Sequence, residues 1–170
     1  MQSFETVQPD RLKEAIFEKI SKEWMLVTAT KPDGTYNTMT ASWGGLGFLW
    51  QRPVAFIFIR PQRYTYEFAE AGEHLSLSFF PPTYREALTF CGSQSGRQVD
   101  KAEACGLTPL QAQGCTYFEQ ASLVLLTRKL YATSILPADI LDPDILRFYE
   151  KGDFHKMYIC EVLEIGERRA

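Results

Sequence analysis

The sequence predicts a mainly β protein, an antiparallel barrel with peripheral helices packed on its outside. Its strand-like segments come in adjacent pairs and do not alternate with long helices, which argues against a doubly wound sheet. Several are apolar throughout, such as "VAFIFI" at 54–59, and a barrel protects such strands by closing its own edges. A chain of 170 residues without repeats or a linker indicates one domain over 1–170.

The first elements follow from apolar spacing and turn chemistry. An amphipathic helix is expected over 11–21, with Asp10 as its N-cap. Its apolar residues recur at helical intervals: Leu12, Ile16, Phe17 and Ile20. Two strands then flank the turn signal "KPDG" at 31–34. The glycine-rich "WGGLGFLW" at 43–50 predicts a bent strand, and 52–60 predicts a strand that is central because both faces are apolar.

The second half of the chain continues the same pattern. A short helix over 65–71 is expected to begin with Thr65 as its N-cap, and "HLSLSFF" alternates as a strand does. The remaining elements are a helix over 81–92 that stops at Gly92, a polar loop running into a short helix over 93–107, a long strand or hairpin over 121–136, a helix over 142–153 capped by Asp142, and a last strand over 155–167.

Composition narrows the class of protein. The net charge is -3 and the pI is near 5.5, so the basic face that nucleic-acid binding needs is not expected. The apolar runs are too short to cross a bilayer, and the first residues lack the features of a signal peptide. We therefore expect a soluble, cytoplasmic protein. Four cysteines without a CxxC pair and two histidines make a metal site improbable, and the thiols are expected to be reduced and mostly buried.

The stretch "RPQRYTYEF" at 60–68 raises the question of an anion site. Arg60 and Arg63 offer planar forks of donors that match phosphate oxygens. Thr65 stands at the expected start of a helix, where free N–H groups carry partial positive charge. The alternative is plainer: the arginines are solvated at a strand end and Thr65 only caps the helix.

Two further stretches have the composition of ligand-binding segments. In "NTMTASWGG" at 37–45, small residues leave the backbone open to the edge of a flat heteroaromatic ring, and Thr40 and Ser42 add hydroxyls. The alternative is a strand leaving its sheet, and for Trp43 packing in the core is favoured. The loop "CGSQSGRQVDK" at 91–101 either closes over a ligand or is a solvated connection.

The catalytic inventory is small. The sequence has no GxSxG, P-loop or GxGxxG motif and no obvious acid–base pair. His155 starts a strand and could reach a site, although a lone histidine is more often structural. With so few proton-transfer groups, the chemistry is expected to belong to a bound cofactor.

Taken together, these stretches resemble a known family. The segment "NTMTASWGGLGFLWQRPVAFIFIRPQRYTYEF", followed by "CGSQSGRQVDKAEACGLTP", is similar to the flavin reductase-like, FMN-binding split-barrel family, in particular its flavoredoxin-like branch. The similarity extends from about Trp24 to the last strand. The combination of "MTASWGG", "RPQRYTY" and "SGRQVDK" at these separations carries the resemblance.

The resemblance implies a six-stranded split β-barrel of Greek-key type, a homodimer, and FMN held near the dimer interface. Its implied cofactor contacts are the backbone of Met39, Thr40, Ala41 and Ser42 along the isoalloxazine ring, Asn37 near the ribityl chain or ring edge, Arg60, Arg63, Tyr64 and Thr65 at the phosphate, and Ser95, Gly96 and Lys101 from the polar loop. Lys101 is a candidate for favouring anionic reduced flavin, and His155 is a second candidate near the site. The cysteine that flavoredoxin-like proteins often carry near the ring has no counterpart in "TASWGG".

Two functions follow from this resemblance. The first is an NAD(P)H-dependent flavin oxidoreductase, in which NADH or NADPH reduces the flavin and the electrons pass to a second acceptor. The alternative is a non-catalytic FMN-binding carrier or sensor. A pyridoxamine-phosphate oxidase-like or haem-binding protein of the same barrel class fits less well, because of the "RPQRYTY" spacing and the shortage of histidines.

Overall fold

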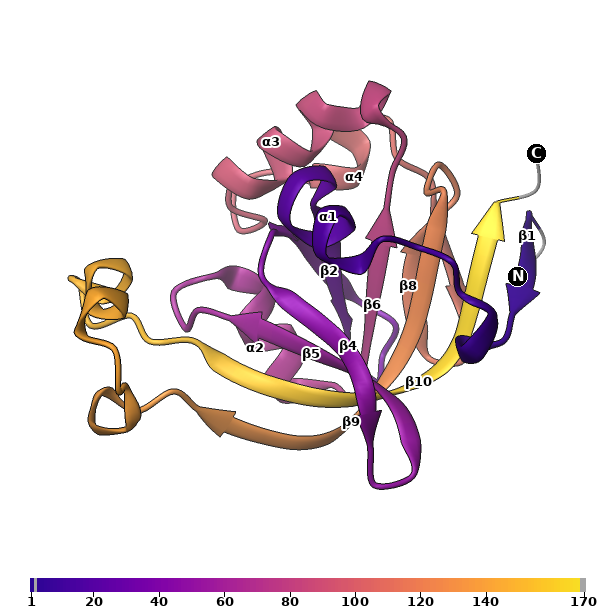
Figure 1. The fold of residues 1–170 in the computed structure, drawn as a ribbon. Helices are drawn as coiled ribbons and strands as arrows, with labels where there is room; N and C mark the ends of the chain where they lie inside the picture. Colours follow the sequence, from indigo (N-terminus) through magenta and orange to yellow (C-terminus); the bar gives the residue numbers. More distant parts are fainter. Residues whose placement is uncertain (2, 169–170) are drawn as a thin grey trace.

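The computed structural model describes residues 1 and 3–168 of the chain (Figure 1). The strands are β1 (Phe4–Val7), β2 (Met25–Thr30), β3 (Tyr36–Ala41), β4 (Gly44–Leu49), β5 (Arg52–Ile59), β6 (His74–Phe79), β7 (Pro109–Ala112), β8 (Cys115–Phe118), β9 (Leu123–Ser134) and β10 (Lys156–Arg168). The helices are α1 (Ile16–Glu18), α2 (Tyr64–Ala71), α3 (Arg85–Ser93) and α4 (Lys101–Ala104). The 3₁₀ and π turns are η1 (Pro9–Arg11), η2 (Lys19–Glu23), η3 (Pro82–Tyr84), η4 (Pro137–Asp139) and η5 (Pro143–Tyr149).

The main sheet is antiparallel and runs in the order β3-β2-β6-β9-β10-β5-β4, with β1 added to the end of β10. The mainly β class with peripheral helices is thereby confirmed. The main sheet has eight strands, two more than the resemblance implies. The hydrogen-bonded path of the described residues ends at β3 and β4, so the expected complete closure of the edges is wrong.

The opening between β3 and β4 has a local cause in the chain. The two strands are consecutive and are joined only by Ser42 and Trp43. Gly44 begins β4 with a φ of 155°, and a Cβ there would lie 2.9 Å from the carbonyl oxygen of Phe56. Only glycine suits this position, and the turn of the backbone sends β4 towards β5 and away from β3.

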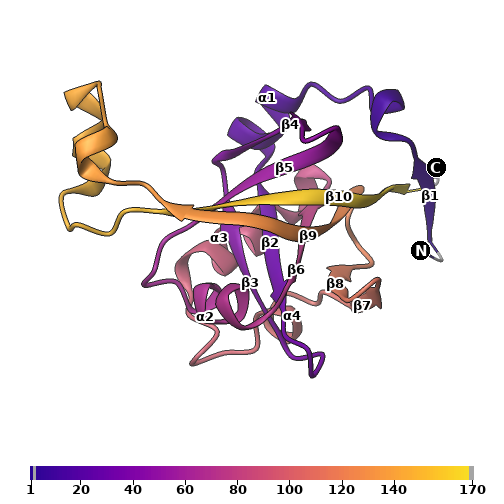
Figure 2. The same ribbon diagram turned by 90° about the horizontal axis from the view of Figure 1, so that it is seen from below.

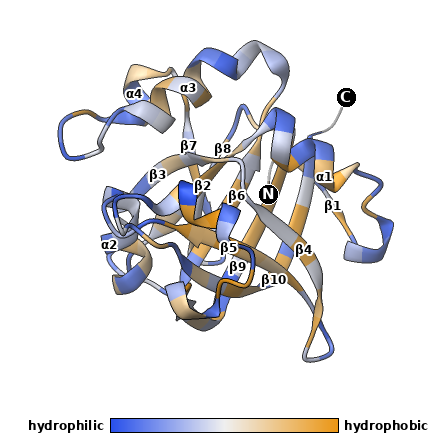
Figure 3. Ribbon diagram, turned by 60° about the vertical axis from the view of Figure 1, so that its left-hand side comes forward, coloured by the Kyte–Doolittle hydropathy of each residue, from blue (hydrophilic) through white to orange (hydrophobic). Residues whose placement is uncertain are grey.

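Apolar side chains fill the barrel and a second layer beneath α3 and α4. The inner cluster includes Val27, Ile57, Leu77, Leu125 and Tyr158, and all of them are buried. The outer cluster takes the alternate side chains of the same strands, such as Leu26 and Leu126. Hydrophobic colour accordingly follows the central strands in Figure 3. Strand β5 lies between β10 and β4, as its two apolar faces predict.

Three expectations about elements need correction. The helix expected over 11–21 is only α1 and η2, over 16–23, because Leu12 packs against the barrel from a chain that is not yet helical. Phe17 is 95% exposed and does not join that apolar face. The helix expected to stop at Gly92 continues to Ser93. Of the two alternatives for 121–136, the structure has the long strand, β9.

Helix α2 also begins differently from the prediction. It starts at Tyr64 with Arg63 as N-cap residue, so Thr65 lies inside the helix and is not the cap. The reason is a tertiary contact: Thr65 is buried and its hydroxyl accepts a hydrogen bond from Asn37 Nδ2 at 2.7 Å. Strands β1, β7 and β8 were not expected, since four residues each are too few for a periodic signal.

The connection between β9 and β10 extends away from the barrel (Figures 1 and 2). We call residues 135–155 the arm. It holds η4 and η5, and Asp142 caps η5 by accepting from the Asp144 N–H, as predicted. The helix expected over 142–153 is, however, only this 3₁₀ segment, which ends at Tyr149. Its exposed apolar side chains are Leu136, Leu141, Ile145, Leu146 and Phe148. Within the described residues, no helix has the length and apolar character needed to cross a membrane.

Candidate functional site

Two small cavities lie side by side at the split of the barrel, and Arg63 lines both. The first, of about 180 Å³, follows the end of β3, and we call it the ring cavity. The second, of about 140 Å³, lies between the start of α2 and the end of α3, and we call it the anion cavity. The structure therefore brings together most of the residues that the sequence proposed for one cofactor.

The ring cavity is built on an edge strand. Its lining consists of Met39, Thr40, Ala41, Ser42, Trp43, Phe58, Arg60, Arg63 and His155. Among the described strands β3 pairs only with β2, so one edge of its backbone has no strand partner there. Free N–H and C=O groups of this kind can pair with the edge of a planar heterocycle. The Thr40 hydroxyl is already engaged, because it donates to the carbonyl of Leu88 in α3.

Aromatic side chains close the other wall of the ring cavity. The rings of Trp43 and His155 lie 5.0 Å apart, and Phe58 meets His155 edge-on at 6.4 Å. Trp43 is 41% exposed, so the favoured expectation that it packs in the core is wrong. The tryptophan leaves the core because Gly44 turns the chain at the split, and its face is available to a ligand.

His155 is held as a neutral ring. It is buried, and its Nδ1 lies 2.9 Å from the Tyr149 hydroxyl. Burial and the nearby charge of Arg60 lower the pKa of His155 to about 4. At neutral pH this side chain therefore presents an uncharged imidazole to the ring cavity.

Arg60 is engaged by the arm. Its guanidinium donates to the Asp153 carboxylate and, at 3.0 Å, to the carbonyl of Phe148. It also lies 5.2 Å from the centre of the Tyr149 ring. Arg60 lines the ring cavity only, whereas the three residues implied with it at a phosphate, Arg63, Tyr64 and Thr65, all line the anion cavity.

The anion cavity contains two cations that lack a counter-ion. Arg63 and Lys101 both line it, and neither forms an ion pair with any carboxylate of residues 1 and 3–168. Lys101 is only 5% exposed and donates through Nζ to the carbonyls of Thr38 and Cys91, each at 2.9 Å. Arg63 donates to the same Cys91 carbonyl at 3.4 Å.

The charges at this cavity are unfavourable in the absence of an anion. Burial and, after it, the neighbouring charge of Arg63 lower the pKa of Lys101 to about 8. Burial also lowers the pKa of Arg63. Buried cations are ordinarily paired with carboxylates. Among the described residues, the buried Lys101 and the half-buried Arg63 are held only by carbonyl groups, which marks a site for a negatively charged ligand.

Asn37 and Gly96 brace the wall between β3 and the polar loop. Asn37 is buried, and a Cβ on Gly96 would lie 1.9 Å from its Oδ1 atom, so the loop can pack there only with glycine. Both residues line a third cavity of about 400 Å³ on the other side of Lys101. They support the anion cavity from behind and do not line it.

The polar loop is fastened to α2 at its middle. Arg97 pairs with Glu67 and stacks over the Tyr64 ring, with its guanidinium carbon 4.5 Å from the ring centre. Ser95 lines the anion cavity, and its hydroxyl accepts from the Arg97 N–H at 3.3 Å. The loop thus covers one side of the anion cavity, as one of its two interpretations requires.

Sequence reasoning missed several lining residues. Phe58 of β5 enters the ring cavity, and the signal was its place two residues before Arg60 on the same side of the strand. Gln62, Gly92 and Gln94 line the anion cavity together with Ser93, which the loop interpretation had included. All four lie in the stretches 60–68 and 91–101 that the sequence marked for a ligand, but nothing local singles out the first three, since α2 and α3 meet there only in the folded protein.

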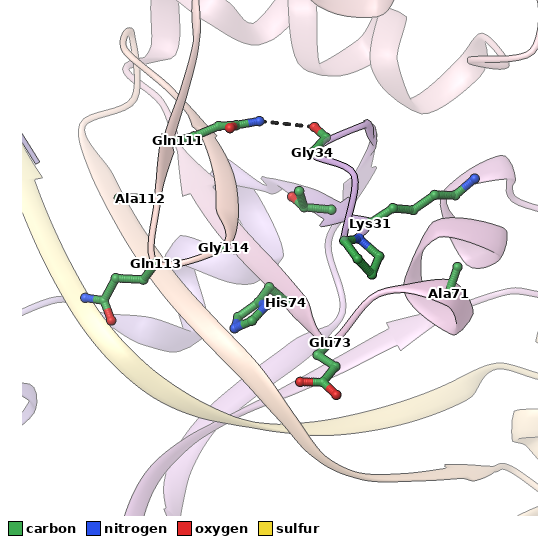
Figure 4. A pocket seen from close by; sticks show the side chains of 11 residues that line it. Lys31, Gly34, Ala71, Glu73, His74, Gln111, Ala112, Gln113 and Gly114 are labelled. Atoms are coloured by element: carbon green, nitrogen blue, oxygen red, sulfur yellow. Dashed lines mark hydrogen bonds between the residues drawn. The ribbon is translucent and has the colours of Figure 1, made fainter.

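A larger cavity lies elsewhere. It measures about 690 Å³ between the β2–β3 turn, the start of β6 and the β7–β8 hairpin (Figure 4). Gln111 donates across it to the Gly34 carbonyl at 3.1 Å, while Lys31, Glu73 and His74 stand around its rim. It shares no residue with the ring or anion cavity. Size alone therefore does not identify the site.

Comparison with known proteins gives the family. The model for the flavin reductase like domain matches residues 17–170. No curated protein matches the chain significantly.

Among solved structures, the fold is similar to the flavoredoxin of Desulfovibrio vulgaris (Miyazaki F), with a TM-score of 0.68 and 20% identity over 86% of this chain and 69% of that one. It is also similar to an FMN-binding protein from Thermus thermophilus, with a TM-score of 0.67 and 20% identity over 96% and 83%. A third likeness is to the styrene monooxygenase flavin reductase of Pseudomonas putida S12, with a TM-score of 0.64 and 12% identity over 87% and 80%. These solved structures share the split-barrel fold. The family supports a flavin-related oxidoreductase or FMN-binding function. By its match to the family model, the chain belongs to the flavin reductase like family.

Proposed function

We propose that this protein binds FMN across the two cavities and works as an NAD(P)H-dependent flavin oxidoreductase. The observation that carries the proposal is the pair of buried Lys101 and half-buried Arg63, two cations without a counter-ion among the described residues, beside a cavity of about 140 Å³. The phosphate of FMN is an anion of suitable charge for them. The adjoining ring cavity, with an open strand edge and an aromatic wall, suits a flat heterocycle.

The residues of the chain divide into two groups by what they would hold. Arg63, Lys101 and Ser95 would bind the phosphate, and the backbone of 39–42 would pair with the edge of the ring. When bound, FMN supplies the redox chemistry, since it accepts two electrons from a nicotinamide and gives them up singly or together. Trp43 and Phe58 would exclude water from the ring. Neutral His155 would pack there without adding a charge.

A homodimer belongs to the same proposal. The arm exposes five apolar side chains on a segment that projects from the barrel, and such a surface is costly in water unless a partner covers it. The ion pair of Arg60 and Asp153 joins the arm to the ring cavity, so a partner that binds the arm would also help to hold Arg60 in place.

The carrier or sensor function remains the second candidate. The two cavities offer few groups that could exchange a proton: burial and the charge of Arg60 lower the pKa of His155 in the ring cavity to about 4, and the Lys101 ammonium in the anion cavity is tied to two carbonyls. A protein that only holds FMN and passes electrons needs no more than this.

The test is to purify the protein, record its absorbance and titrate it with FMN and riboflavin. We expect flavin bands and clearly tighter binding of FMN, because riboflavin lacks the phosphate. A protein that takes up neither flavin would overturn both functions. Anaerobic addition of NADH or NADPH then separates the two functions. Bleaching of the bound flavin supports the oxidoreductase, and flavin that stays oxidised with both nucleotides supports the carrier or sensor function.

A further inference from the structure

Two thiols lie in contact directly behind the anion cavity. Cys91 is in α3 and Cys105 follows the end of α4, and their Sγ atoms are 3.9 Å apart. Cys91 is fully buried, whereas Cys105 is partly exposed. Cys115 and Cys160 are buried on strands β8 and β10.

The two thiols bracket the polar loop. Residues 92–104 run from the end of α3, along the anion cavity and through α4. Cys91 and Cys105 therefore lie at the two ends of this segment, close together. Elsewhere the loop is fastened by the pair Arg97–Glu67, which is about half exposed, and such pairs contribute little to stability. A covalent bond at the base would hold the loop far more firmly.

Cys91 is also connected to both cations of the cavity. Its carbonyl accepts from Lys101 at 2.9 Å and from Arg63 at 3.4 Å. A change at the Cys91 side chain therefore acts on the backbone group that positions Arg63 and Lys101.

We propose that Cys91 and Cys105 form a reversible disulfide that closes the 92–104 loop at its base and slows the release of bound FMN. The part that concerns FMN rests on the function proposed above. The thiol pair itself stands on the geometry of α3 and α4 alone.

The chemistry requires an oxidant of the small-molecule disulfide class. The Cys105 thiolate attacks that disulfide, forms a mixed disulfide and releases one small thiolate. Cys91 then attacks the Cys105 sulfur, loses its proton and releases the second small thiolate. The two protein thiols lose two electrons and two protons, and the small disulfide becomes two thiols. Burial raises the pKa of Cys91 to about 12, so Cys105 is the first to react.

The geometry is close to what the bond needs. The two Sγ atoms must approach from 3.9 Å to about 2.05 Å, which side-chain rotation and a small shift of the four-residue helix α4 can supply. The ring so formed spans 91–105, a short loop of the kind that native disulfides often close.

The first experiment maps the bond in the FMN-loaded protein. The protein is reduced, equilibrated with oxidised and reduced glutathione, quenched with an alkylating reagent and digested for mass spectrometry. We expect a Cys91–Cys105 cross-link that is lost on reduction, with Cys115 and Cys160 recovered as alkylated thiols after denaturation. In the Cys105→Ser variant no cross-link should form, and in the matched Cys115→Ser variant it should form as before.

The second experiment follows the release of FMN by fluorescence after dilution. Oxidised protein should release FMN about threefold or more slowly than reduced protein, because the loop must open for the cofactor to leave. Cys105→Ser should show the faster rate under both conditions, and Cys115→Ser should keep the difference.

The outcomes separate the two proposals. Stable glutathione on Cys105 without a cross-link to Cys91 would overturn the thiol pair. A cross-link that leaves the FMN release rate unchanged would overturn the claim that the disulfide slows FMN release by closing the loop. If the protein binds no FMN, the proposed function fails, while mapping in the flavin-free protein still decides whether the disulfide forms.

Discussion

Arg63 is the residue on which FMN binding is expected to depend most. A charge-assisted hydrogen bond contributes roughly 1.5–3 kcal/mol, so Arg63→Ala should weaken FMN binding about tenfold or more. Riboflavin binding should change little. The free energy of unfolding of the flavin-free protein should not fall, because the variant removes a half-buried charge that repels Lys101.

Titration calorimetry and chemical denaturation measure these two effects. Arg52→Ala is the control, since Arg52 is exposed and paired with Glu161 on another part of the barrel. Unchanged FMN affinity in Arg63→Ala would show that the phosphate lies elsewhere.

Lys101 should make FMN binding depend on pH. Its pKa is lowered to about 8 by burial and by the charge of Arg63, and binding of an anion favours the protonated amine. FMN affinity should therefore be highest below pH 8 and should fall as the pH rises through that value. Equilibrium dialysis across this range measures it. Riboflavin is the matched ligand, and a riboflavin affinity that fell in parallel would contradict the assignment.

His155 should affect stability on the acidic side. Its pKa falls from 6.5 to about 4 on folding, so the unfolded chain binds more protons between these values. The contribution of neutral His155 is complete above pH 6.5 and is lost as the pH falls towards 4. Thermal melts of the protein and of His155→Gln should diverge in this window, with the variant less sensitive to acid. Parallel pH profiles of the two proteins would place the sensitivity in other groups.

At the scale of elements, Gly96 sets how closely the polar loop packs against β3 and α2. A Cβ at Gly96 would lie 1.9 Å from Asn37 Oδ1 and 3.2 Å from the Tyr64 ring. Gly96→Ala should therefore displace the loop, destabilise the fold by about 1–3 kcal/mol and weaken FMN binding. Differential scanning calorimetry and flavin titration measure both effects.

Gly92→Ala is the matched control for this change. It lies within α3, and its added Cβ would make an ordinary contact of 3.4 Å with Thr40. Because alanine favours helix, this variant should be as stable as the parent or slightly more so. A loss of stability in Gly92→Ala as large as in Gly96→Ala would contradict the steric explanation.

At the scale of the whole molecule, the arm should decide the oligomeric state. Leu141 is 95% exposed and contributes nothing to the core of its own chain. If the arm docks on a second copy, Leu141→Asp combined with Leu146→Asp should produce a monomer with weaker FMN binding, because a charge is costly in an apolar interface. Gln113→Asp, on the β7–β8 hairpin, is the control for added charge. Sedimentation velocity distinguishes the two, and a double variant that remains a dimer would show that the interface lies on another face.

Local sequence signals predicted most of the strands and the identity of the site stretches. Strand β5 could be recognised because both faces are apolar, and α4 as the short helix expected after the polar loop. The same signals misjudged 11–21, where helical spacing was present but Leu12 packs on the barrel in a segment that precedes the helix. Thr65 has the chemistry of a helix cap, but the Thr65 hydroxyl instead accepts a hydrogen bond from the buried Asn37 amide.

The sequence alone was enough for the class of fold, the family and the three stretches that line the two cavities, because periodicity, turn residues and motif composition act over short distances along the chain. The tertiary structure was needed to give "RPQRYTYEF" two different roles: Arg60 pairs with Asp153 of the arm, and Arg63 remains as a half-buried cation beside Lys101. It also placed Trp43 at the cavity and Cys91 against Cys105. These outcomes depend on contacts between residues such as Cys91 and Cys105, 14 apart in sequence, and Arg60 and Asp153, 93 apart, and local sequence patterns do not determine such long-range contacts.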